Sequence, residues 1–167
     1  MILYQNSPEI EDPRARKSGC FVRSLLRPAE LYTGRNFNAV ELNKLFDRVL
    51  SLEFAHGDFI VDDPASIVKQ GFLFRGEDRE CYQTGLRRER DKKHNLITPV
   101  VTWWQWVEKN PVYKCVAFEI MKGWTVNRHA HYRLGALPRT ETFDPYTPKP
   151  FIDFEIYQTY YWLGEAR

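Results

Sequence analysis

The sequence predicts an α+β fold in which N-terminal helices pack on a C-terminal antiparallel β-sheet. In the first half of the chain, apolar residues recur at the spacing of an amphipathic helix, whereas in the last third they alternate with polar residues between turn signals. Helices first and strands later favour separate layers over the alternating βαβ units of a parallel sheet. The chain has 167 residues, 43% of them hydrophobic, which suits a single domain over 1–167 with a substantial core.

Composition argues against several classes of protein. There are 24 basic and 22 acidic residues, so the net charge of +2 gives no overall electrostatic case for a nucleic-acid or membrane-surface protein. Three widely spaced cysteines, Cys20, Cys81 and Cys115, argue against a disulfide framework or a zinc knuckle. The N-terminus lacks the pattern of a secretion signal, and no window is apolar enough for a membrane helix. We therefore expect a cytoplasmic protein with no cofactor, no nucleic-acid partner and no membrane partner.

One cysteine opens the first predicted helix. Apolar residues within 21–26 recur at helical spacing, Ser18 fits the N-cap position and Pro28 limits the helix, which we expect over about 19–31. Cys20 then lies in the first turn, where unpaired N–H groups and the positive end of the helix dipole favour a nucleophilic thiolate. A lone cysteine beside apolar neighbours is also typical of a small buried side chain without chemistry. The helix alone leaves both interpretations open.

Two further helices have recognisable starts. Asn38 followed by Glu41 has the pattern of a capping box, and apolar positions keep a helical period to about residue 51. The Asp-Asp-Pro sequence at 62–64 offers a cap followed by proline at the first helical position, and Gly71 offers a stop. A short helix is therefore expected over about 64–70. We interpret both helices as scaffold.

The middle of the chain has a less regular pattern. The basic run at 86–94 holds five Lys or Arg residues that could hold phosphates, but acidic residues within it dilute the charge, and we favour a solvated loop or hairpin tip. The aromatic segment 100–107 could be a stacking platform for bases or sugars. Because Trp103, Trp106 and Val107 stand at i, i+3 and i+4, we favour a helix that faces the core.

The last third predicts four antiparallel strands. Alternation over 113–121, followed by Lys122-Gly123 as a turn, indicates a central strand. Three more strands are expected at about 129–135, 140–144 and 152–162, the last of them long and aromatic.

Two of these strands carry the side chains that a cysteine nucleophile needs. A cysteine hydrolase requires an imidazole within reach of the sulfur and a carboxylate or amide that fixes the tautomer of the imidazole. His131 lies on one strand and Asp144 ends the next, so adjacent antiparallel strands could deliver both to the helix that carries Cys20. His129, on the same strand as His131, is the alternative base.

In this layout the chain resembles the papain-like cysteine peptidases, and within them the bacteriocin-leader (double-glycine) peptidases. The shared features are an early Gln, a Cys that opens the first helix, a strand with a His-aromatic start and an Asp-Pro that ends the following strand. The resemblance implies that Cys20 is the nucleophile, His131 the general base and Asp144 the group that orients it. It also implies that Gln5 forms the oxyanion hole together with the backbone N–H of the cysteine. Gln5 stands farther from the cysteine than is usual in that family.

Three functional hypotheses follow. The first is a thiol hydrolase or acyl transferase that acts on a peptide, an isopeptide or a peptidoglycan amide. The second is a non-catalytic interaction module that keeps the papain-like shell and binds a protein partner through the Trp-rich segment and the basic run. The third is a metal site built on His129, His131 and Asp144, because alternate strand residues point to one face. His-x-His alone is a weak zinc pattern, and we expect no metal.

Overall fold

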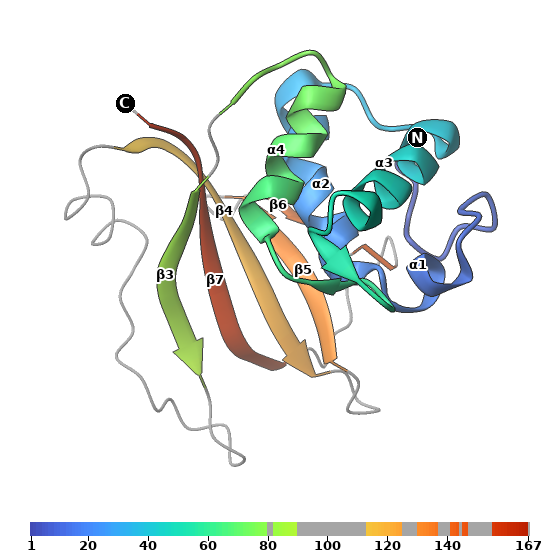
Figure 1. Ribbon diagram of the computed structural model, residues 1–167. Helices are drawn as coiled ribbons and strands as arrows, with labels where there is room; N and C mark the ends of the chain where they lie inside the picture. The colour runs from blue at the N-terminus through green and yellow to red at the C-terminus, as the bar shows by residue number, and fades with distance from the viewer. Residues whose placement is uncertain are drawn as a thin grey trace.

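The computed structural model describes residues 1–79, 82–89, 113–124, 130–136, 141–143, 145–146 and 155–166. Helices occupy the first part of the chain and an antiparallel five-stranded sheet occupies the second, with the helical layer packed beside the sheet (Figure 1). The α+β class predicted from the sequence is therefore confirmed.

The described part of the chain contains the helices α1 (Pro13–Ser18), α2 (Cys20–Thr33), α3 (Ala39–Ser51) and α4 (Pro64–Phe74). α2 covers the helix predicted from the apolar spacing, although Pro28 lies inside it and does not end it. It ends instead at Gly34, whose φ of 65° is the left-handed conformation that glycine adopts without steric cost. α1 is not anticipated by the sequence patterns.

Gly19 forms the corner between α1 and α2. Its N–H donates to the Ala15 carbonyl oxygen over 2.8 Å, and its own carbonyl accepts from the Arg23 N–H over 2.8 Å. A Cβ at this position would lie 2.5 Å from the Ala15 oxygen, so a larger residue cannot enter without moving the backbone. The prediction of Ser18 as N-cap is therefore wrong: Ser18 is the last residue of α1, and Gly19 is the N-cap of α2.

The start of α3 is the capping box that the sequence predicts. The Asn38 side chain accepts a hydrogen bond from the Glu41 N–H over 2.9 Å, and the Glu41 carboxylate accepts one from the Asn38 N–H over 2.9 Å.

α4 begins as predicted, with Asp63 as N-cap and Pro64 as its first residue, but it does not end at Gly71. The helix continues to Phe74, and Gly71 lies inside it, where α4 packs on α2. A Cβ on Gly71 would lie 3.2 Å from the Cβ of Ala29, so the missing side chain lets α4 approach α2 closely.

The strands form two antiparallel sheets. A hairpin joins β1 (Ala55–His56) to β2 (Ile60–Val61), and the larger sheet has the strand order β3-β7-β4-β5-β6. Its strands are β3 (Tyr82–Glu89), β4 (Tyr113–Trp124), β5 (Ala130–Ala136), β6 (Glu141–Phe143) and β7 (Glu155–Ala166). β4 to β7 correspond to the four predicted strands.

Two details of this sheet correct the sequence-based predictions. Lys122-Gly123 is not a turn: β4 continues to Trp124, and its register with β7 shifts between these two residues, as at a β-bulge. The start of the basic run is not a loop, because 87–89 belong to β3 and pair with β7. Residues 90–94 of that run and the aromatic segment 100–107 lie outside the described residues.

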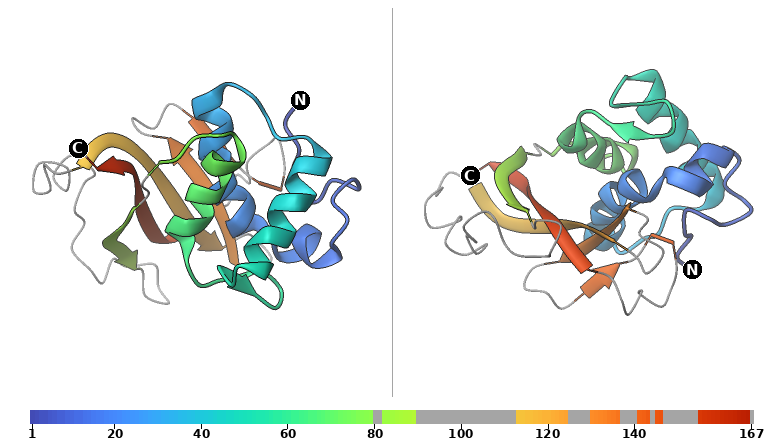
Figure 2. Two further views of the ribbon diagram at one scale, coloured as in Figure 1. Left: turned by 45° about the horizontal axis from the view of Figure 1, so that its top comes forward. Right: turned by 90° about the horizontal axis from the view of Figure 1, so that it is seen from below.

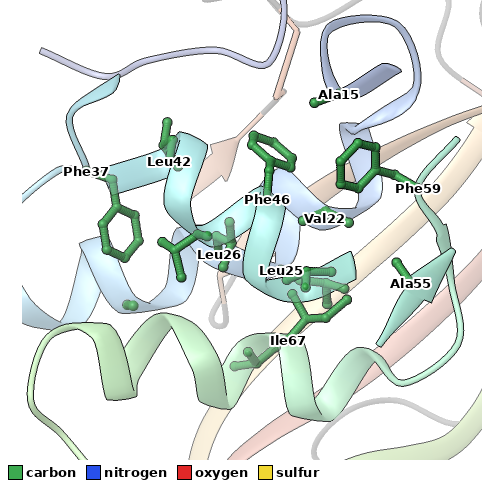
Figure 3. Close-up of a cluster of buried hydrophobic side chains, with 14 of the residues drawn as sticks. Ala15, Val22, Leu25, Leu26, Phe37, Leu42, Phe46, Ala55, Phe59 and Ile67 are labelled. Carbon is green, nitrogen blue, oxygen red and sulfur yellow. The ribbon is translucent and has the colours of Figure 1, made fainter. Parts of the chain in front are cut away.

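The core of the helical layer is built around α2. Val22, Leu25 and Leu26 are fully buried and meet apolar side chains from α1, α3, α4 and β1 (Figure 3). On its other side α2 packs against β4 and β5, and the two further views show it next to the sheet (Figure 2). The helix that begins with Cys20 is therefore packed on one side by the helical core and on the other by the sheet. In the described part of the chain, no helix combines the length and the apolar character that crossing a membrane requires.

Candidate functional site

Cys20 is the first residue of α2, as the helix prediction requires. Its relative exposure is 9%, and it follows the Gly19 corner directly. The first N–H groups of an α-helix have no acceptor within the helix, and they carry the positive end of its dipole. The thiol therefore lies beside backbone N–H groups that can donate to an oxygen anion formed next to the sulfur.

Gln5 is buried at 1% relative exposure, and its amide is incompletely paired. Its side-chain Nε2 donates to the carbonyl oxygen of Arg16, in α1, over 3.3 Å. Its Oε1 has no hydrogen-bond partner. Burial of an unpaired amide oxygen costs free energy. Among the buried side-chain atoms without a partner in the described residues, the Gln5 oxygen is the only acceptor. The intervening residues 6–18 contain a turn and α1, which bring the chain back and explain how Gln5 reaches the segment just before Cys20.

A second contact fixes the N-terminal segment on α2 itself. Arg23, one turn after the cysteine, donates from Nε to the carbonyl oxygen of Leu3 over 2.9 Å. The N-terminal segment thus contacts one residue that precedes Cys20, Arg16, and one residue that follows it, Arg23. No hydrogen bond joins Cys20 to Gln5 directly within the described residues.

His131 lies on β5, where its backbone pairs with Gly123 of β4. β5 packs against α2, so the strand with the predicted base is a direct neighbour of the helix with the predicted nucleophile. His129 and Asp144 lie outside the described residues.

The residues on both sides of Asp144 are described, and both reach the N-terminal half. The Pro145 carbonyl oxygen accepts a hydrogen bond from the Gln5 backbone N–H over 2.7 Å. Phe143 is 8% exposed and stacks on Tyr4, with ring centroids 6.0 Å apart and planes 16° from parallel. The structure therefore brings together the Cys20 helix, Gln5 and the two chain neighbours of Asp144.

Next to these residues lies a buried ionic cluster that the sequence patterns do not predict. The Nη2 of Arg23 donates to both carboxylate oxygens of Glu30, over 3.0 and 2.9 Å, and both side chains are fully buried. Glu30 also accepts from the Nη1 of Arg27 over 2.8 Å and from the backbone N–H of Phe37 over 2.9 Å. Burial lowers the pKa of the Arg23 guanidinium, and the attraction of the Glu30 carboxylate opposes that shift.

The cluster reaches the strand before Asp144. The guanidinium carbons of Arg23 and Arg27 lie 4.9 and 5.2 Å from the centroid of the Phe143 ring, within the range of a cation–π interaction. The sequence holds one signal for this cluster. Arg23 and Glu30 are two helical turns apart, which places two opposite charges on one face of a helix that is otherwise rich in apolar residues.

No group of three or more His, Cys, Asp or Glu side chains that could hold a metal ion is present within the described residues. Comparisons of the chain with models of protein families, with curated proteins and with solved structures found no match.

Proposed function

We propose that this chain is a cysteine peptidase or amidase of papain-like fold, with Cys20 as nucleophile, His131 as base, Asp144 as orienting group and Gln5 as oxyanion donor. The observation that carries the proposal is the position of Gln5. It is buried, it touches the segment that leads into Cys20, and its backbone is bonded to Pro145, the residue after Asp144. Residues far apart in the sequence thus meet at Gln5, which also touches α1, the helix just before the one that carries the thiol.

The chemistry is acyl transfer through sulfur. The Cys20 thiolate attacks the carbonyl carbon of an amide, so that a C–S bond forms and the electron pair of the C=O bond moves to oxygen. The imidazolium of His131 then protonates the leaving nitrogen as the C–N bond breaks. Water, deprotonated by the same imidazole, attacks the thioester, releases the carboxylic acid and restores the thiol. Asp144 holds the imidazole in the tautomer that both steps require.

Two donors are available for the oxyanion. The backbone N–H of Cys20 belongs to the first turn of α2, and the Nε2 of Gln5 carries two N–H groups, of which one bonds to Arg16. The second N–H remains for the substrate oxygen. Loss of one such donor costs about 10²–10³-fold in kcat in other hydrolases.

Turnover of a library of peptides capped with fluorogenic amides tests the proposal. Cys20→Ala should abolish turnover and keep the fold, and His131→Ala should lower kcat by roughly 10²–10⁴-fold. Cys115→Ala, which removes a cysteine of β4, is the matched control and should keep the wild-type rate. Undiminished turnover in Cys20→Ala would contradict the assignment.

The burial of Cys20 supports a second candidate function, that of a non-catalytic module with the same papain-like fold that binds a protein partner. In that case the thiol is a small buried side chain, and part of the binding surface is the basic run that begins on β3. Cys20→Ser would then keep partner binding, and the folded wild-type chain would resist alkylation at Cys20.

A further inference from the structure

Arg23 touches three segments that carry or adjoin the proposed catalytic residues. It belongs to α2, which begins with Cys20. Its Nε holds the Leu3 carbonyl, two residues before Gln5, and its guanidinium lies over the ring of Phe143, one residue before Asp144. One side chain thus joins the nucleophile helix, the N-terminal segment and β6.

These contacts use features that only arginine combines. The Nε donates to Leu3 and the Nη2 to Glu30, while the carbon of the same guanidinium lies 4.9 Å from the centroid of the Phe143 ring. A lysine ammonium is a compact point charge that lacks the planar group and the fixed N–H donors of a guanidinium. It cannot contact Leu3, Glu30 and Phe143 at once in this geometry. The Nη1 of Arg23 has no hydrogen-bond partner, so the guanidinium is held in this position without complete hydrogen bonding.

We propose that Arg23 is a positioning residue, which sets the segments of Gln5 and Asp144 relative to Cys20; this inference rests on the proposed function. Two further contacts join the N-terminal segment to the residues around Asp144: Tyr4 stacks on Phe143, and the Gln5 backbone N–H donates to the Pro145 carbonyl oxygen. A shift of the Phe143 ring therefore moves the backbone that precedes Asp144 and strains the bond that holds Gln5.

The chain offers a matched control in Arg75. Its side chain is 3% exposed, its Nη1 donates to Glu41 over 2.9 Å and its Nη2 donates to the Arg35 carbonyl over 3.1 Å. Its guanidinium carbon lies 4.2 Å from the centroid of the Phe37 ring. Arg75 thus makes the same three kinds of contact as Arg23, but none of them is with Leu3 or Phe143, so Arg75→Lys removes a similar arrangement and keeps the contacts of Arg23 with the segments of Gln5 and Asp144.

Hydrogen exchange at the Gln5 amide measures the positioning without reference to catalysis, because this N–H donates to Pro145. In the full chain, Arg23→Lys should speed exchange at Gln5 by about tenfold relative to the Val49 amide of α3, through local opening. Arg75→Lys should leave that ratio unchanged. An unchanged ratio in Arg23→Lys, or an equal rise in both variants, would overturn the proposal.

Phe143→Leu provides a second test, which also decides if Arg23→Lys does not fold. It keeps the Arg23–Glu30 pair and removes the aromatic ring that both Arg23 and Tyr4 contact. It should therefore raise the Gln5 exchange ratio and slow alkylation of Cys20 by iodoacetamide at about pH 6, where an ordinary thiol is almost fully protonated. The combined effect of Arg23→Lys and Phe143→Leu on the Gln5 exchange ratio should be smaller than the sum of the single effects, because both remove the contact between Arg23 and Phe143. Wild-type exchange in Phe143→Leu would refute the role of Arg23. Failure of the proposed function would appear separately, as wild-type alkylation that does not depend on His131.

Discussion

At the scale of single residues, the corner before Cys20 depends on glycine. Gly19→Ala places a methyl group 2.5 Å from a backbone oxygen that cannot move away alone. We expect a loss of about 1–3 kcal/mol in the free energy of unfolding, measured by urea denaturation. Gly34→Asn is the comparison, because a Cβ at Gly34 meets no atom within 4 Å, so this variant costs only the strain of the left-handed conformation, which asparagine tolerates better than most residues. A Gly19→Ala chain as stable as the wild type would contradict the close approach of Gly19 to the Ala15 carbonyl oxygen.

Asp12 gives the start of α1 a dependence on pH. Its carboxylate accepts hydrogen bonds from the Arg14 side chain and from the Arg14 backbone N–H, and the side-chain bond is the main cause that lowers the pKa of Asp12. Since the folded-state pKa is the lower one, this stabilisation is present above the unfolded-state pKa of about 3.9 and is lost as the pH falls through the folded-state value.

Comparison of the wild type with Asp12→Asn isolates this charge, because asparagine remains a good N-cap. The variant should melt at a lower temperature at pH 7, and the difference should shrink as the pH falls below about 4. Melting curves across this range check it. A difference that grows at acid pH would contradict the sign of the shift.

At the scale of elements, the contact between α2 and α4 depends on the absence of a side chain at Gly71. Gly71→Val should overfill this contact and lower the free energy of unfolding by about 1–3 kcal/mol. Ala29→Gly added to that variant should restore part of the loss, because the nearest atom to the new side chain is the Cβ of Ala29. Denaturation of the two single variants and the double variant measures the coupling. Additive losses would show that the two positions do not touch.

Elements with local signals could be predicted from the sequence, and those set by packing could not. The capping box fixed the start of α3 because Asn38 and Glu41 satisfy each other within a single turn. Gly71 has the pattern of a helix stop, but contact with α2 overrides it. Lys122-Gly123 has the pattern of a turn, but pairing on both sides of β4 carries the strand through it. In β3, the partner strand β7 supplies a pairing that the charged sequence does not suggest.

At the scale of the whole molecule, the helical layer and the sheet meet at the proposed site. α2 packs against β5, and Phe143 of β6 packs on Arg23 and Arg27. The position of Cys20 at the start of a helix could be predicted, because the helical spacing of the apolar residues after it is a local pattern. The approach of Gln5 could not, because it depends on α1 and on Pro145, which follows most of the chain. The Arg23 cluster also needs the tertiary structure, since the partners of Arg23 range from Leu3 to Phe143.

The most direct test of the central claim is the pH dependence of Cys20 alkylation by iodoacetamide, with the modified residue identified by mass spectrometry. The wild-type chain should react selectively at Cys20 and remain fast at about pH 6, where an ordinary thiol is almost fully protonated. In His131→Ala the rate at that pH should fall by about tenfold or more, because the imidazolium no longer stabilises the thiolate. His129→Ala, the matched control, should react like the wild type. A Cys20 that is inert, or that reacts equally with and without His131, would contradict the proposed enzyme.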